Sequence, residues 1–233
     1  MSWNLHRFPD DETLTTALSG RIAAALHEAV KQRGRAVLAV SGGSTPRRLF
    51  DKLSRLELPW EQITVTLVDE RWVSQSHQDS NAALVHRHLL QGHAQRATFI
   101  GLTTDDPDPF TAQVAVNQRL TSLPRPWDVV LLGMGDDGHT ASYFPGAPQL
   151  QEALEPAPGQ LCCAITPPLA PHPRMTLTLP VLLGSRHLVL HIIGPHKQRV
   201  LQQAMVAGPV AELPVRVVLH QQQTPLEIYH ADQ

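Results

Sequence analysis

The chain has 233 residues, of which 42% are hydrophobic, and a formal net charge of −2. This length suits one large domain or two small ones. The net charge shows no sign of the strongly basic surface by which proteins bind nucleic acids or anionic membranes. No apolar run approaches the roughly 18 residues of a membrane span and no signal peptide is evident, so we expect a cytoplasmic protein.

The predicted elements of the first half alternate between strands and helices. A short edge strand at 4–8 precedes a helix that Asp10 or Asp11 caps and that Gly34 ends after residue 32. Apolar residues recur every fourth position along one side of this helix: Leu14, Leu18, Ile22, Leu26 and Val30. Continuous apolar runs at 36–40 and 63–68 are typical of strands covered on both faces. Further helices are predicted at 47–56, from Asp79 or Ser80 to about 90, and at about 109–123, with a short strand at 97–100.

The second half continues this alternation after a proline-rich segment. Strands are predicted at 129–132, 161–165, 175–179, 187–193 and 226–229, and helices at 194–207 and 215–219. The segment PPLAPHP at 167–173 is too short for a domain linker. The order therefore predicts one α/β domain over residues 1–233, with a mainly parallel, doubly wound Rossmann-like sheet and helices on both faces.

Cysteine and histidine patterns give no redox or metal motif. The adjacent Cys162 and Cys163 cannot form an ordinary disulfide, which favours a reducing compartment. The most closely spaced histidines, His86 and His88, point about 200° apart on a predicted helix. We therefore predict no metal site.

The turn after strand 129–132 fits the G-x-G-x-x-G pattern of dinucleotide-binding folds, but we reject that interpretation. Asp136 and Asp137 would face a pyrophosphate, which needs bare amides and a helix N-terminus. The acid expected about 20 residues later falls in a loop, and Pro145 ends any crossover helix too soon. The turn instead brings carboxylates and an imidazole to the carboxyl edge of the sheet.

His139 is the residue that we expect to act as a general base. The ordinary pKa of an imidazole, about 6.5, suits proton transfer near neutrality, and Asp137 is close enough to orient the ring. The alternative is a histidine satisfied in the core, but a glycine turn at a strand end is exposed.

The segment SGGSTP at 41–46 joins a strand to a helix and predicts an anion-binding loop. Glycines let the backbone turn its N–H groups inward, and the hydroxyls add donors at the helix N-terminus. It is not a Walker A loop, and the alternative is a plain strand-to-helix turn.

Lys197 opposes the dipole of the helix that it begins, so we expect an anionic ligand to compensate it; a solvent-exposed lysine is the alternative. Arg174 lies between a proline-rich loop and a predicted strand, and this position alone does not distinguish a ligand-binding residue from a solvent-exposed one.

Asp69 and Arg71 follow the strand at 63–68, with Glu70 between them. Carboxylates at this edge are costly unless they are paired or used, and Arg71 is an obvious partner for either. A structural ion pair is therefore the alternative to a catalytic role.

Five segments in order resemble one family, the 6-phosphogluconolactonases: SGGSTPRRLF, VDERWV followed by DSN, LLGMGDDGHTASYFPG, RMTLTLPVL and HLVLHIIGPHKQRV. The resemblance extends from Asn4 to about Leu219. It implies the fold that this family shares with glucosamine-6-phosphate deaminases and ribose-5-phosphate isomerases. It also implies hydrolysis of 6-phospho-D-glucono-1,5-lactone in the pentose phosphate pathway, without a cofactor. We expect this small molecule as the partner, no nucleic acid or membrane, and a monomer or small homo-oligomer.

The resemblance also implies roles for individual residues. The family's catalytic histidine corresponds to His139, with Asp137 beside it and Asp69 and Arg71 at the neighbouring strand end. Its phosphate site corresponds to Gly42, Gly43, Ser44 and Thr45, with Arg174 and Lys197 as cationic partners.

Two other functions remain open at this point. Glucosamine-6-phosphate deaminases resemble the chain at Asp69, Asp137 and His139, but they carry a glutamate where this chain has Phe144, and a phenyl ring cannot transfer protons. A non-catalytic sugar-phosphate-binding protein is the second alternative, although none of the catalytic positions is degenerate.

Overall fold

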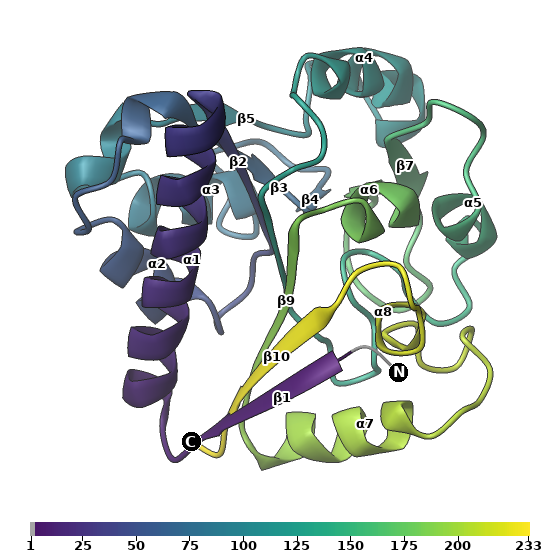
Figure 1. The fold of residues 1–233 in the computed structure, drawn as a ribbon. Helices are drawn as coiled ribbons and strands as arrows, with labels where there is room; N and C mark the ends of the chain where they lie inside the picture. The colour runs from purple at the N-terminus through teal and green to yellow at the C-terminus, as the bar shows by residue number, and fades with distance from the viewer. Residues whose placement is uncertain (1–2) are drawn as a thin grey trace.

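The centre of the fold is a seven-stranded sheet in which every pair of neighbouring strands is parallel. The computed structural model describes residues 3–233. Figure 1 shows the sheet, whose strands follow the order β1-β10-β9-β6-β2-β3-β5. Their bounds are β1 (Trp3–Phe8), β2 (Ala36–Val40), β3 (Ile63–Leu67), β5 (Thr98–Ile100), β6 (Val129–Leu132), β9 (His187–Ile193) and β10 (Leu226–Ala231).

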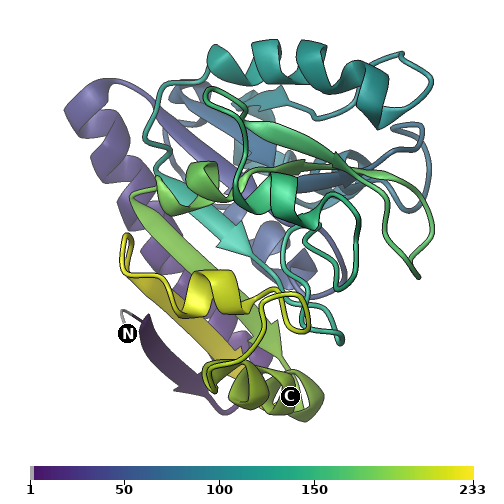
Figure 2. The same ribbon diagram turned by 90° about the vertical axis from the view of Figure 1, so that its right-hand side faces the viewer.

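Helices cover both faces of this sheet. On one side lie α1 (Asp11–Arg33), α2 (Arg47–Leu53) and α3 (Asn81–His88); on the other lie α6 (Leu179–Leu183), α7 (Pro195–Met205) and α8 (Arg216–Leu219), as Figures 1 and 2 show. Every residue of β2 and β6 is buried, as expected for strands covered on both faces. The predicted doubly wound parallel sheet is confirmed.

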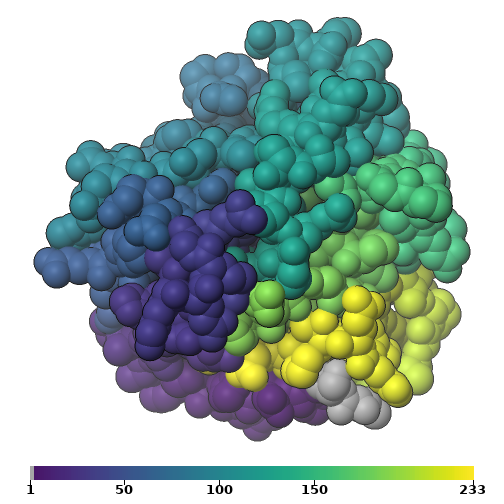
Figure 3. Space-filling view, turned by 45° about the horizontal axis from the view of Figure 1, so that its top comes forward, coloured from purple at the N-terminus to yellow at the C-terminus, as the bar shows by residue number. Residues whose placement is uncertain are grey.

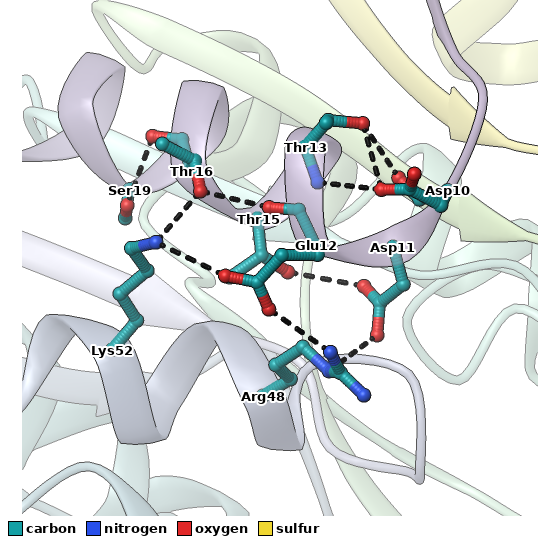
Figure 4. Close-up of polar contacts among 9 residues, drawn as sticks. All are labelled: Asp10, Asp11, Glu12, Thr13, Thr15, Thr16, Ser19, Arg48 and Lys52. Carbon is teal, nitrogen blue, oxygen red and sulfur yellow. Dashed lines mark hydrogen bonds and ion pairs between the residues drawn. The ribbon is translucent and has the colours of Figure 1, made fainter.

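The N-terminus of α1 is tied to α2 by charged side chains. Asp10 caps α1 by accepting a hydrogen bond from the Thr13 amide at 2.8 Å, and Gly34 ends the helix with a φ of 72°. The carboxylate of Glu12 pairs with Arg48 at 3.0 Å and with Lys52 at 3.6 Å (Figure 4). These cations of α2 are therefore engaged by α1, next to the loop that precedes α2.

A second sheet, of three antiparallel strands, was not predicted. It has the order β4-β8-β7, with β4 (Asp69–Arg71), β7 (Cys162–Ile165) and β8 (Arg174–Leu177). Helices α4 (Pro109–Thr121) and α5 (Leu150–Leu154) pack against it. The predicted strand at 175–179 is wrong at its end, because residues 179–183 form α6.

The remaining predictions differ from the structure mainly at element ends. β1 is an edge strand beside β10, and Figure 3 shows the C-terminal residues in yellow against the N-terminal ones in purple. Two short 3-10 helices, η1 (Trp60–Gln62) and η2 (Gly92–Arg96), were missed.

Cys162 and Cys163 are free thiols in β7, and burial raises the pKa of each to about 12. Within residues 3–233, no helix has both the length and the apolar character needed to cross a bilayer.

Candidate active site

The carboxyl ends of the central strands surround a cavity of about 310 Å³. Because the strands are parallel, the segments after β2, β3, β6 and β9 reach the same edge of the sheet. The cavity is lined by 41–46 after β2, by Asp69, Arg71 and Asn81, by 131–136, His139 and Ala141, and by His191 and Lys197. Most of the predicted site residues therefore line one cavity.

The loop after β2 has its backbone turned toward this cavity. Within residues 3–233, the amides of Gly42, Gly43 and Ser44 donate to no protein acceptor. A Cβ atom at position 42 would lie 1.8 Å from Oδ1 of Asn81, so glycine is needed for this close approach. Asn81 is itself held by donating from Nδ2 to the carbonyl oxygen of Asp69 at 2.8 Å. The loop thus offers backbone donors from a fixed position.

The turn after β6 holds His139 against Asp137. The Gly135 amide donates to the His139 carbonyl oxygen at 2.8 Å, which closes the turn. His139 Nδ1 lies 2.5 Å from Oδ1 of Asp137, and the His139 amide donates to the same oxygen at 3.1 Å. A Cβ at Gly135 would lie 2.1 Å from His139 Nδ1, so the glycine makes room for the ring.

The pairing with Asp137 determines which ring nitrogen of His139 can act. Partial burial raises the pKa of Asp137, but its hydrogen bonds to His139 and the charge of that ring outweigh burial and hold the pKa below its ordinary value. An ionised carboxylate only accepts a hydrogen bond, so Nδ1 donates to Asp137 and Nε2 is the ring nitrogen left to exchange a proton. The Phe144 ring packs on the imidazole with centroids 4.4 Å apart. Asp137 and Phe144 thereby fix the orientation of the His139 ring.

Asp69 and Glu70 are both buried, but they have different partners. Asp69 Oδ2 accepts from the Ser142 hydroxyl at 2.7 Å, and no residue of the described chain donates to Oδ1. Glu70 accepts from the amides of Arg71, Asn81 and Ala82, each at 2.7 Å. Burial raises the pKa of Glu70 despite these bonds. Glu70 therefore stabilises the start of α3, whereas Asp69 keeps one oxygen for the cavity.

Arg71 does not pair with either of these carboxylates within residues 3–233, so the structural ion pair is not formed. It donates from Nη1 to the Asp79 carbonyl oxygen at 2.6 Å. Arg174 lies opposite Arg71 in the β4–β8 register and stacks over Phe144, 5.6 Å from the ring centroid. Burial lowers the pKa of this guanidinium.

Arg174 lines a second, adjoining cavity of about 300 Å³ rather than the first. Asp69, Arg71 and His139 line both cavities, so they lie where the two meet. Arg174 is thus brought close to the proposed base but not into the cavity of the Gly42–Thr45 loop, and its role toward a phosphate stays a prediction.

Lys197 has a partner that the sequence did not indicate. Its Nζ lies 2.7 Å from Oδ1 of Asp136, and this hydrogen bond holds the pKa of Asp136 below its ordinary value. An aspartate of the β6 turn thus offsets the charge of this lysine, and the expected anionic ligand stays a prediction. Lys197 still lines the cavity that contains the Gly42–Thr45 loop.

Several residues of the cavity were missed by sequence reasoning. His191 lies inside β9, and both of its ring nitrogens, like the Ser41 hydroxyl, are buried without a partner in residues 3–233. Asn81, at the first position of α3 after the N-cap Ser80, also lines the cavity. Only the alternation of side chains along β9 could have indicated His191.

Comparisons of the sequence and of the structure with known proteins both find 6-phosphogluconolactonases. Residues 9–226 match the family described as glucosamine-6-phosphate isomerases/6-phosphogluconolactonase. A 6-phosphogluconolactonase of Rhizobium meliloti (strain 1021) is 45% identical over 99% of this chain and 100% of its own length. The crystal structure of a 6-phosphogluconolactonase from Shewanella baltica OS155 superposes with a TM-score of 0.95 at 41% identity, covering 97% of both chains. A monomeric glucosamine-6-phosphate deaminase shares the fold, with a TM-score of 0.74 at 20% identity over 97% of this chain and 96% of its own.

Proposed function

The chain belongs to the glucosamine-6-phosphate isomerase/6-phosphogluconolactonase family, and from this premise we propose how its residues perform a lactonase reaction. It is a carboxylic ester hydrolase that converts 6-phospho-D-glucono-1,5-lactone to 6-phospho-D-gluconate in the oxidative pentose phosphate pathway, as its 6-phosphogluconolactonase relatives indicate. The assignment of chemistry to individual residues is our proposal.

His139 acts as the general base. Its Nε2 takes a proton from a water molecule as that water attacks the lactone carbonyl carbon, C1. Asp137, at 2.5 Å from Nδ1, stabilises the imidazolium that forms. The imidazolium then gives its proton to the departing ring oxygen, which becomes the C5 hydroxyl of the product. An activated ester needs no stronger nucleophile than water, so one base and one oxyanion site are sufficient.

The developing oxyanion on the carbonyl oxygen needs donors near His139. A backbone N–H of a glycine turn or the guanidinium of Arg71 can supply them, since Arg71 lines both cavities together with His139. Asp69 lines the same two cavities, and its Oδ1 has no donor in the described chain. This oxygen is suited to accept a hydrogen bond from the attacking water or from a sugar hydroxyl.

The phosphate of the substrate binds in the Gly42–Thr45 loop. The support for this is the set of backbone amides without protein acceptors and the Lys197 ammonium group on the same cavity. Arg174 approaches from the adjoining cavity. We also propose that residues 1–233 fold as one domain, which works in the cytoplasm as a monomer or a small homo-oligomer.

The contact between Phe144 and His139 is the observation that distinguishes the lactonase from the deaminase. An apolar ring lies 4.4 Å from the imidazole, centroid to centroid, at the position where deaminases carry a proton-transferring glutamate. A single base beside an aspartate suits hydrolysis of an ester better than the opening and isomerisation of an amino sugar.

The test is an assay of the hydrolysis of freshly generated 6-phosphogluconolactone. The rate of acid release is measured and the spontaneous rate is subtracted. His139→Ala should lower kcat by about 10² to 10⁴ with little change in KM, because the ring acts in the transition state. His93→Ala, an exposed histidine that lines neither cavity, should retain full activity. A near-normal kcat in His139→Ala would disprove the role of the base. Turnover of glucosamine-6-phosphate by the wild type would favour the deaminase.

A further inference from the structure

We propose that His77, Asp79 and His172 form a binding site for a divalent transition-metal ion such as Zn²⁺. The three residues lie in two loops beside the second cavity, and the lactonase chemistry above does not use their side chains. The site is independent of the proposed mechanism, because neither histidine belongs to the base, oxyanion or phosphate machinery.

The ligand atoms are already close together. One ligand atom from each residue, a ring nitrogen or a carboxylate oxygen, lies within 4.8 Å of the other two. His172 Nε2 lies 3.1 Å from Oδ2 of Asp79, and His77 Nδ1 lies 3.8 Å from that oxygen. A tetrahedral Zn²⁺ with bonds of about 2.0–2.1 Å separates its ligands by about 3.3–3.4 Å. The two shorter separations are therefore within about 0.5 Å of this value, and the third must shorten by no more than about 1.5 Å. The partly exposed side chains can make this adjustment by rotamer changes.

The backbone around the ligands is held by two buried or half-buried arginines. Arg71 donates to the carbonyl oxygen of Asp79 and Arg174 to that of His172, each at 2.6 Å. His172 has a φ of 66°, an unusual conformation for a residue with a side chain. The pairing of β4 with β8 brings both loops together, so the strained backbone aims His172 at Asp79.

The donor set indicates the kind of ion. Two imidazoles and one carboxylate suit Zn²⁺, Co²⁺ or Ni²⁺, whereas Mg²⁺ and Ca²⁺ prefer oxygen ligands alone. Three protein ligands leave a coordination position open to solvent. The two nearby guanidinium groups repel a cation, so we expect weaker binding than at a closed structural zinc site. Asp79 and His172 line the cavity that also contains His139, so the ion would lie on one wall of it.

The experiment is a calorimetric titration of the tag-free protein with Zn²⁺, repeated with Co²⁺ by visible absorption. We expect one ion per chain. His77→Ala and His172→Asn should each weaken binding at least about tenfold, since a ligand contributes no less than an outer-shell partner. Asparagine is chosen at position 172 because it tolerates a positive φ while removing the imidazole.

Three controls keep the result specific. His93→Ala and His139→Ala should bind Zn²⁺ like the wild type; the second variant excludes the His139–Asp137 pair as the site. Mg²⁺ should give no comparable heat. The proposal is overturned if the wild type binds no Zn²⁺, or if His77→Ala and His172→Asn, checked for folding by circular dichroism, bind it unchanged. Loss of binding in His139→Ala alone would place the ion at the catalytic pair and overturn the proposal too.

Discussion

His191 should make the folded protein sensitive to mild acid. This side chain is 2% exposed, and neither ring nitrogen has a partner within residues 3–233. Burial lowers its pKa from 6.5 to about 4. The folded state therefore keeps the ring neutral at pH values where the unfolded chain protonates it.

The sign and size of the effect follow from this pKa. The stabilisation is fully present above the unfolded pKa of 6.5 and is lost as the pH falls to about 4, where the folded state also takes up the proton. At about 1.4 kcal/mol for each unit of pKa shift, the free energy of unfolding falls by about 3 kcal/mol over this window from His191 alone. Burial also lowers the pKa of His187, which acts in the same direction.

The assay is urea unfolding of the wild type and of His191→Leu at about pH 7.5 and about pH 4.5, with the free energy extrapolated to water. The wild type should lose more stability on acidification than the variant, by most of those 3 kcal/mol. His187 and the carboxylates are common to both proteins and cancel in the comparison. Equal pH dependence of the two proteins would show that His191 is not held neutral and would refute the reasoning.

Three further substitutions test the turns and helices that support the site. Gly135→Ala would bring a methyl group to 2.1 Å from His139 Nδ1, so kcat should fall by about 10² in the lactonase assay while the thermal unfolding temperature changes little. Glu70→Ala should lower the free energy of unfolding by about 3 kcal/mol in urea titrations, because buried amides at the start of α3 lose their acceptor; Glu70→Gln should lose less. Gly20→Ala, in the interior of α1 with no atom within 4 Å of the added methyl, should raise it by about 0.5–1 kcal/mol, and a decrease would contradict this.

The large sheet could be predicted because its signals are local. The fully buried runs of β2 and β6 are apolar along their whole length, and the caps at Asp10 and Ser80 are short-range hydrogen bonds. Such features need only neighbours in sequence. The small sheet has no such signal, because β4 consists of Asp69, Glu70 and Arg71 and becomes a strand only by pairing with β8.

The sequence indicated which site residues lie at the ends of the strands. It did not indicate which of their side chains contact one another. The glycines and His139 follow buried strands, so the sequence indicates their common edge. The contact of Lys197 with Asp136 joins the start of α7 to the turn after β6, and no spacing rule links these positions. The same holds for His172 beside Asp79, which histidine spacing could not reveal.

Backbone strain is concentrated where the small sheet meets the cavities. In residues 3–233, the non-glycine residues with positive φ are Ala141, at 51°, and His172, at 66°. Ala141 lines the first cavity and His172 the second. Residues in such conformations persist only where surrounding contacts over-determine them.

The small sheet and its arginine supply those contacts. The amide of Ser142, next to Ala141, donates to Oγ1 of Thr176 at 3.2 Å, and Arg174 holds the carbonyl of His172. The Ser142 hydroxyl in turn fixes Asp69. The large sheet thus brings the loops to one edge, whereas β8 fixes the walls around His139. Thr176→Val removes the hydroxyl that accepts from the Ser142 amide. It should therefore lower kcat in the lactonase assay by a larger factor than it lowers the equilibrium constant for folding measured in urea.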